Sequence, residues 1–200
     1  MSVINTDPTL LRDKVRGAYS CAAEQPKEKH AFPVGKQFAE SLGYPADLLA
    51  RLPSVACEAF AGVSNVSLFA EVPVGATVLD LGCGSGTDTL IAARRVGPTG
   101  RVIGVDFSTT MLSRAGQAVA ESGVVNVELR ESDAERLPIS DGEIDVAIVN
   151  GIFNLNPARD AIFRELARVI KPAGTLFAAE LILSQPLPPE TRASETDWFA

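Results

Sequence analysis

Short apolar runs alternate with amphipathic stretches along the second half of the chain. The apolar runs predict β-strands over residues 77–81, 102–106, 127–131, 144–150 and 175–183. Between the strands, apolar residues spaced three and four apart predict helices over residues 87–96, 109–122 and 157–170. Because alternating strands and helices favour right-handed crossovers, we expect an α/β, doubly wound fold with a mainly parallel sheet.

The first 70 residues have a different pattern, of helix and loop without a strand. Leu11, Val15, Ala18 and Ala22 share one face of a helix predicted over residues 8–24. Shorter helices are expected over residues 34–42, 45–52 and 53–61, with a break at 62–65. We therefore expect two parts, a helical N-terminal cap over residues 1–70 and an α/β core over residues 71–200.

A glycine-rich turn follows the first predicted strand. Gly82, Gly84 and Gly86 have the spacing G-x-G-x-G, and Asp80 lies two residues before the first glycine. Twenty-four residues after Gly82, the second strand ends in Asp106. Such a turn lets the main chain approach a nucleoside, and an acid at the next strand end accepts hydrogen bonds from ribose hydroxyls.

The glycine spacing and Asp80 together favour a positively charged ligand. Dinucleotide sites use G-x-G-x-x-G beneath a pyrophosphate, which a carboxylate at Asp80 would repel. S-adenosylmethionine (SAM) carries a sulfonium and an α-amine, so a SAM site is the leading interpretation and a nicotinamide site the weaker one. Two structural alternatives stay open: Asp80 could cap the helix near Thr87, and Asp106 could be a turn acid.

Composition and charge limit which binding partners and which cellular compartment are expected. A net charge of −7 argues against nucleic acid as a main partner. No apolar run reaches the ~18 residues of a membrane span, and the N-terminus lacks the pattern of a signal peptide. Three cysteines without metal spacing indicate free thiols in a reducing cytoplasm. The single histidine, His30, is interpreted as a surface residue, so no metal site is expected.

Residues 77–183 resemble a class I SAM-dependent methyltransferase in several motifs that occur in order. The resemblance implies a Rossmann-like fold, SAM as the cofactor and a small-molecule methyl acceptor. Asp80 and the three glycines would hold the methionine moiety, and Asp106 would bind both ribose hydroxyls. The other implied cofactor contacts are Phe107 on the adenine, Met111, Asp133 at the adenine amine, Ala134 through its main-chain N–H, and Asn150 beside the methyl group.

Ordinary structural roles remain open for several of these residues. Phe107 could belong to the core, and Asp133 could cap a turn. Asn150 could shape the loop that follows its strand. Cys83, inside the glycine turn, is interpreted as a small filler rather than a nucleophile.

A narrower resemblance to bacterial arsenite methyltransferases covers residues 92–106, 149–157 and 163–172. That family binds As(III), a soft ion, through several cysteine thiolates, one just before the motif strand and one just after the asparagine of the fourth strand. Here those positions correspond to Val63 and Gly151, while Cys21 and Cys57 match the pattern poorly. We therefore expect a relative of the arsenic enzymes with a different or lost acceptor.

Methyl transfer from a sulfonium depends on alignment and a dry pocket more than on acid–base help. The catalytic candidates are accordingly Asn150 and Tyr19, with Tyr19 closing over SAM from a helical lid. A SAM-binding scaffold without turnover is the alternative function. The chain stops soon after the fifth predicted strand, so the helix and antiparallel hairpin that end this family's fold are expected to be missing. The exposed edge strand that would result predicts a homodimer.

Overall fold

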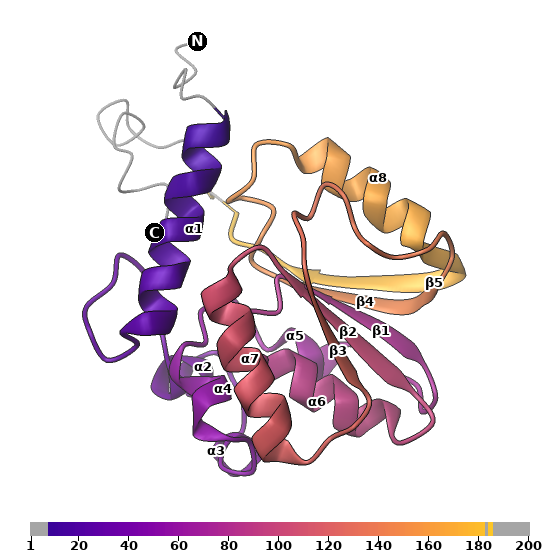
Figure 1. Ribbon diagram of the computed structural model, residues 1–200, viewed down its shortest axis with the longest axis horizontal. Coiled ribbons are helices and arrows are strands. Elements are labelled where there is room, and N and C mark those ends of the chain that lie inside the picture. Colours follow the sequence, from indigo (N-terminus) through magenta and orange to yellow (C-terminus); the bar gives the residue numbers. More distant parts are fainter. Residues whose placement is uncertain (1–7, 183, 186–200) are drawn as a thin grey trace.

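A five-stranded parallel sheet forms the centre of the molecule. The computed structural model describes residues 8–182 and 184–185. Its strands are β1 (Thr77–Leu81), β2 (Arg101–Asp106), β3 (Val127–Glu131), β4 (Ile144–Asn150) and β5 (Ile170–Ala179). They lie in the order β3-β2-β1-β4-β5, and every neighbouring pair is parallel (Figure 1). The predicted α/β doubly wound fold is thus confirmed.

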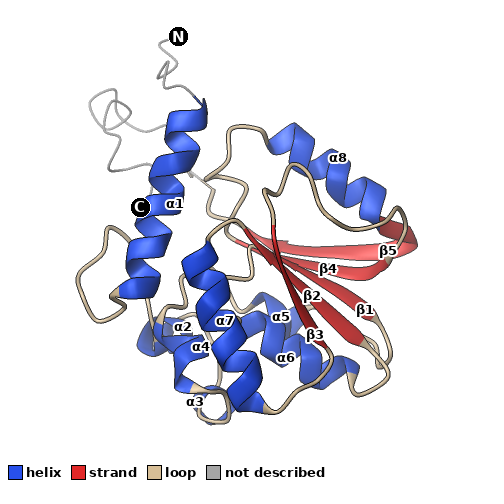
Figure 2. Ribbon diagram, viewed as in Figure 1, coloured by secondary structure: helices blue, strands red, loops and turns tan. Residues whose placement is uncertain are grey.

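Helices cover both faces of this sheet (Figure 2). α6 (Thr87–Val96) and α7 (Thr109–Ser122) lie on one face, and α8 (Arg159–Val169) lies on the other. The central strands are therefore covered on both sides, and the continuous apolar run of β4 is fully buried, as parallel sheets require. The direction in which successive strands are added to the sheet reverses at β1: β2 and β3 lie on one side of it, and β4 and β5 lie on the other. The carboxyl ends of these strands meet at the switch point where such folds bind ligands.

The helix that follows β2 begins and ends at residues suited to those positions. The Ser108 hydroxyl caps α7 by accepting from the main-chain N–H of Met111 at 3.3 Å. Gly123 ends the helix in the left-handed conformation, with φ 73°. Because Ser108 is its N-cap, α7 begins at Thr109, close to Asp106 and the switch point.

In the described part of the chain, which begins at residue 8, five helices precede the sheet. They are α1 (Pro8–Glu24), α2 (Lys36–Ser41), α3 (Ala46–Leu49), α4 (Ser54–Glu58) and α5 (Val66–Phe69). α1 lies beside α7, away from the sheet (Figure 1). The short helices share a hydrophobic cluster with α6 and α7, to which Leu49, Ala56 and Leu90 belong. Burial of this apolar surface fixes the N-terminal segment next to the start of α6.

Several predicted boundaries were wrong. The fifth strand was predicted over residues 175–183, but it begins at Ile170 and ends at Ala179. It starts earlier because residues 170–174 extend the ladder beside β4 through an irregular register. Residue 183 lies outside the described part of the chain. The break predicted at 62–65 is followed by α5, a single turn too short to give a periodic signal. The three short helices are also briefer than predicted, and α8 begins at Arg159.

Candidate active site

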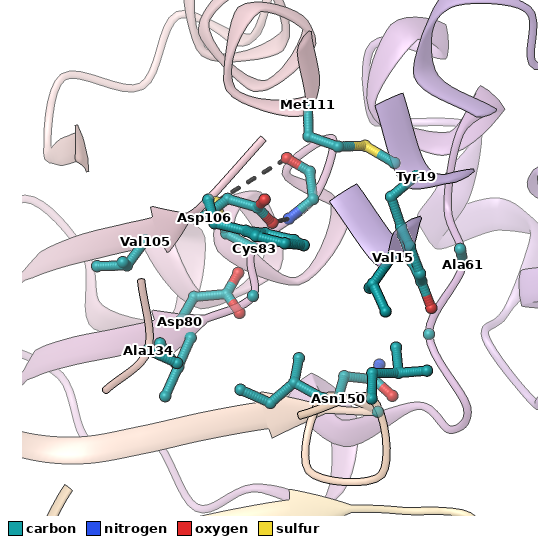
Figure 3. A pocket seen from close by; sticks show the side chains of 18 of the residues that line it. Val15, Tyr19, Ala61, Asp80, Cys83, Val105, Asp106, Met111, Ala134 and Asn150 are labelled. Carbon is teal, nitrogen blue, oxygen red and sulfur yellow. Dashed lines mark hydrogen bonds between the residues drawn. The ribbon is translucent and has the colours of Figure 1, made fainter. Parts of the chain in front are cut away.

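One pocket opens at the carboxyl ends of β1, β2 and β4, with α1 on its far side. Its empty volume is about 1010 Å³, including space open to solvent. Every residue predicted to bind the cofactor lines it except Gly86, and Tyr19 lines it from α1. Figure 3 shows Val15, Tyr19, Ala61 and Asn150 on one side of the pocket and Asp80, Asp106 and Cys83 on the other.

The glycine turn between β1 and α6 has a conformation that favours glycine. Gly82, Gly84 and Gly86 have φ values of 77°, 51° and 92°. At Gly82 a side chain is also excluded by space, because a Cβ there would lie 2.5 Å from Cγ2 of Ile152. The turn thus brings main chain to the pocket wall at Gly82 and Gly84, and it leads directly into the N-terminus of α6.

Asp106 is held by this turn. One carboxylate oxygen accepts from the N–H of Gly84 at 2.8 Å, and the other accepts from the N–H of Ser108 at 2.9 Å. Burial raises the pKa of this carboxyl, while the N–H groups of Ser108 and Gly84 oppose the rise. The residue therefore serves as the turn acid of the structural alternative, and each oxygen keeps a further lone pair for a ligand in the pocket.

Asp80 is a buried carboxylate without a cationic partner. Only 2% of the residue is exposed, and the hydroxyl of Thr89 donates a hydrogen bond to it. Within the described chain no lysine or arginine forms an ion pair with it. Burial, and after it the charge of Asp88, raise the pKa of Asp80 to about 8. The N-cap residue of α6 is Gly86, and the Asp80 carboxylate interacts with the main-chain N–H of Thr89 in the first turn of that helix, so it contributes to capping.

Asn150 belongs to a second buried polar network. Its side-chain oxygen accepts from the N–H groups of Val63 at 2.8 Å and Ser64 at 3.1 Å. Its amide nitrogen donates to the carbonyl of Ser64 at 2.8 Å and to Asp88 at 2.9 Å. All four hydrogen-bonding positions of the amide are thus used by the protein. This supports the loop-shaping alternative for Asn150, whose atoms still line the pocket.

Asp88 is the other end of that network. It accepts from the hydroxyls of Tyr44, at 2.5 Å, and Ser67, as well as from Asn150. Burial raises the pKa of Asp88, and its hydroxyl and amide donors oppose the rise. Burial and the charge of Asp88 raise the pKa of Tyr44 above its usual value, so the hydroxyl stays protonated and donates. These contacts join the start of α6 to the wall formed by residues 61–64.

The predicted adenine side of the pocket is bridged by α1. Asp133 lies 3.4 Å from Arg12 and 3.4 Å from Arg16, and the Arg16 guanidinium lies 5.2 Å from the centre of the Phe107 ring. Arg12 also approaches Glu135, at 3.4 Å. Phe107, Met111, Asp133 and Ala134 all line the pocket here, as predicted. These ion pairs connect the helix predicted to be a lid with the loop after β3.

Tyr19 contributes an aromatic ring from α1. The ring stacks on Phe32, with centroids 4.6 Å apart and planes 24° from parallel. Burial, together with the charges of Asp106 and Glu180, raises the pKa of the Tyr19 hydroxyl, so it remains protonated. In the described part of the chain this hydroxyl has no hydrogen-bond partner. It is therefore available to a ligand.

The thiols are not gathered for a soft ion. Cys21 is exposed, whereas Cys57 and Cys83 are buried, and burial raises the pKa of both buried thiols. Among residues 8–182 and 184–185, no three His, Cys, Asp or Glu side chains are grouped to hold a metal. Val63 and Gly151 are in contact, since a Cβ at Gly151 would lie 2.8 Å from a Val63 methyl. An apolar contact thus occupies the place where the resemblance would put two thiols.

Several site residues were missed from the sequence. Asp88, Tyr44 and Ser67 form the buried network, and Arg12 and Glu135 line the adenine side. Glu135 has a buried carboxylate oxygen, Oε2, without a partner, so it is a second candidate beside Asp133 for the adenine amine. An acid at the second position of a predicted helix was a usable signal for Asp88. Tyr44 and Ser67 carried no such signal, because only the folded loops bring them to α6.

Comparison with known proteins agrees with this geometry. Residues 74–199 match the protein family described as a methyltransferase domain. The chain belongs to this family of class I SAM-dependent methyltransferases. SAM is the methyl donor of the family, and the buried, unpaired Asp80 fits its positive charge. Across the described residues, the methyltransferase domain has no helix long and apolar enough to cross a membrane.

The names of proteins related to this chain indicate different methyl acceptors. An arsenite methyltransferase from Halobacterium salinarum is 38% identical over 153 residues, which cover 76% of this chain and 39% of that protein. A demethylmenaquinone methyltransferase from Lactobacillus johnsonii is 34% identical over 131 residues, 64% of this chain and 52% of the relative. The crystal structure of an arsenic(III) SAM methyltransferase from Chlamydomonas reinhardtii superposes with a TM-score of 0.62 at 26% identity, covering 84% of this chain and 57% of that one. The methyltransferase domain thus spans about two fifths to half the length of these curated relatives.

Proposed function

We propose that this chain transfers the methyl group of SAM to a small-molecule acceptor. The observation that carries the proposal is Asp80, a carboxylate 2% exposed inside the pocket with no cationic partner among the described residues. Ionising this carboxyl without a partner costs several kcal/mol, so the pocket favours a cationic ligand that stabilises its ionised form. A pyrophosphate would add a second negative charge next to Asp80, which disfavours a nicotinamide cofactor.

The proposed cofactor contacts follow the pocket from one side to the other. Asp80, Gly82 and Gly84 would hold the methionine moiety, while Asp106 would accept from the ribose hydroxyls. Phe107, Met111, Ala134 and either Asp133 or Glu135 would surround the adenine. Gly86 would act through the shape of the turn, since it does not line the pocket. SAM supplies a methyl group on a positively charged sulfur, and these residues bind and orient it.

The proposed roles of the catalytic candidates differ from each other. Tyr19 would close the pocket from α1 and contact the acceptor, while residues 1–70 would act as the cap over the core. Asn150 would position the wall of residues 61–64, because its amide groups are already bonded to the protein. No basic side chain among the proposed catalytic residues is needed, since transfer from a sulfonium depends mainly on alignment in a dry pocket.

A SAM-binding scaffold without turnover is the second candidate. Its support is the absence of a thiol cluster in the described chain, where the arsenite enzymes would bind their substrate. Methyl transfer separates the two functions. The chain is incubated with SAM labelled in the methyl group and with arsenite plus glutathione, 1,4-naphthoquinol or small amines. Label appearing in any acceptor supports the enzyme, and loss of transfer in Asp106→Ala ties it to this pocket.

We also propose a homodimer through the outer edge of β5, which among the described residues pairs only with β4. A second copy could continue the ladder along this edge. Light scattering tests the proposal: a mass of about twice 21.1 kDa supports it, and a monomeric mass at high protein concentration contradicts it.

A further inference from the structure

The side of the pocket formed by α1, residues 61–62 and residues 150–151 has a composition of its own. We call it the acceptor end, and it consists of Val15, Tyr19, Ala61, Gly62, Asn150 and Gly151. Figure 3 shows Val15 and Tyr19 from α1 on the same side of the pocket as Ala61, with Asn150 below them in this view. The naming of this end rests on the proposed function, which places the cofactor along Asp80 and Asp106.

No member of the acceptor end carries a charge. The charges of Asp106 and Glu180 act on the Tyr19 hydroxyl. Of the other carboxylates in the pocket, Asp80 is assigned to the cofactor and Asp88 to the Asn150 network. The Asn150 amide has no hydrogen-bonding position left. Of the side-chain polar groups in this end, only the Tyr19 hydroxyl lacks a partner within the described chain.

An anion would meet no unpaired cation here, because Arg12, which lines the pocket from the same helix as Tyr19, is paired with Asp133 and Glu135. The carboxylates of Asp106 and Glu180 already accept hydrogen bonds from main-chain N–H groups, so an ammonium group would lose its hydration without an unpaired charge to replace it.

The Tyr19 hydroxyl is held in place rather than left to rotate. The ring stacks on Phe32, with centroids 4.6 Å apart, and packs against Ala59, which follows α4, and Met111 of α7. These contacts fix the ring. Because the hydroxyl is protonated, it can donate one hydrogen bond to an oxygen of a bound molecule. The thiols cannot substitute for it, since Cys57 is outside the pocket and Cys83 lies on the opposite side.

We infer that the acceptor is an uncharged, largely apolar molecule that carries an oxygen, such as a hydroxylated aromatic ring, and that Tyr19 donates a hydrogen bond to this oxygen. The apolar lining supplies most of the binding through surface removed from water. The single donor orients the ring, as in other small-molecule sites where few polar groups fix the pose. Arsenite bound through thiolates does not fit this end of the pocket.

Three probes of the same ring size test the inference. The chain is first saturated with S-adenosylhomocysteine, and calorimetry then measures binding of 1-naphthol, naphthalene and 1-naphthoate. We expect 1-naphthol to bind roughly fivefold more tightly than naphthalene, the effect of one neutral hydrogen bond. The charged 1-naphthoate should bind at least tenfold more weakly than 1-naphthol, because its carboxylate loses water without gaining a cation.

The variant Tyr19→Phe assigns the effect to one hydroxyl. It should abolish the difference between 1-naphthol and naphthalene while leaving naphthalene binding unchanged, so naphthalene reports that the pocket is intact. A preference for 1-naphthol that persists in Tyr19→Phe would overturn the role of Tyr19. Tighter binding of 1-naphthoate, or no binding of either neutral ring, would overturn the acceptor class. Failure of S-adenosylhomocysteine to bind would instead count against the proposed function.

Discussion

Asp80 makes the binding of SAM depend on pH. In the pocket without ligand, burial and the charge of Asp88 raise the pKa of Asp80 to about 8, compared with 3.8 for a free carboxyl. At pH 7 this carboxyl is therefore mostly protonated. A sulfonium and an amine beside it favour the ionised form, so binding lowers the pKa and releases a proton. The affinity for SAM should consequently rise with pH and level off above about pH 8.

The magnitude follows from the same pKa. Below pH 8 each pH unit changes the affinity by up to about tenfold, and close to 0.9 of a proton is released at pH 7. Calorimetry in two buffers of different ionisation enthalpy measures both quantities. In Asp80→Asn the pH dependence should vanish and the affinity at pH 8 should fall. An affinity that stays flat between pH 6 and 8, or proton uptake on binding, would refute the reasoning.

The empty protein provides an independent check on the sign. A carboxyl whose folded pKa is raised contributes stability that is present at low pH and lost as the pH rises through the folded value. Asp80→Asn removes this penalty and can stabilise the empty protein at pH 7 by up to about 4 kcal/mol. The gain should shrink as the pH falls and vanish well below pH 4, where the wild-type carboxyl is protonated in both the folded and the unfolded state. Thermal unfolding across this range measures it, with Asp145→Asn as the control carboxyl whose pKa is lowered by Lys171.

Three further predictions concern the walls of the pocket. Asn150→Ala leaves the N–H groups of Val63 and Ser64 without their acceptor and should lower the free energy of unfolding, measured with denaturant, by about 2–4 kcal/mol. The control Ser122→Ala, which loses a hydrogen bond far from the pocket, should lower it by about 1 kcal/mol or less. Gly82→Ala forces a Cβ to within 2.5 Å of Ile152 at positive φ, so it should lower the free energy of unfolding by about 1–3 kcal/mol; an unchanged melting temperature would contradict this. Arsenite should not raise the melting temperature, because the buried thiols have raised pKa values and are not grouped, and a shift that disappears in Cys83→Ser would show that this view is wrong.

Much of the core was predictable because its signals are local. β1, β3 and β4 and the helices α6 and α7 have the predicted bounds, since apolar runs, the glycine turn and the Ser108 cap lie within each segment. The cofactor side of the pocket was predictable for the same reason. Parallel strands bring their carboxyl ends together, and therefore Asp80, Asp106 and Asn150 line one pocket.

The N-terminal segment was less predictable because its short helices are stabilised by tertiary contacts. α3 and α5 have four residues each, too few for a periodic pattern, and they depend on packing against α6 and the sheet. The Asp88 network was missed on the same grounds. Tyr44 and Ser67 lie 44 and 21 residues from Asp88 in sequence and meet it only in the fold. For Asn150, predicted beside the methyl group, the same network supports the proposal that it shapes the pocket wall.

Calorimetric titration of SAM into the purified chain, with NADH as the control ligand, tests the central claim most directly. We predict micromolar SAM binding, no measurable NADH binding, and a loss of at least tenfold in affinity for Asp106→Ala, because the ribose hydroxyls lose a charged acceptor. Binding of NADH in preference to SAM, or SAM binding that is unaffected by Asp106→Ala, would contradict the assignment of this pocket.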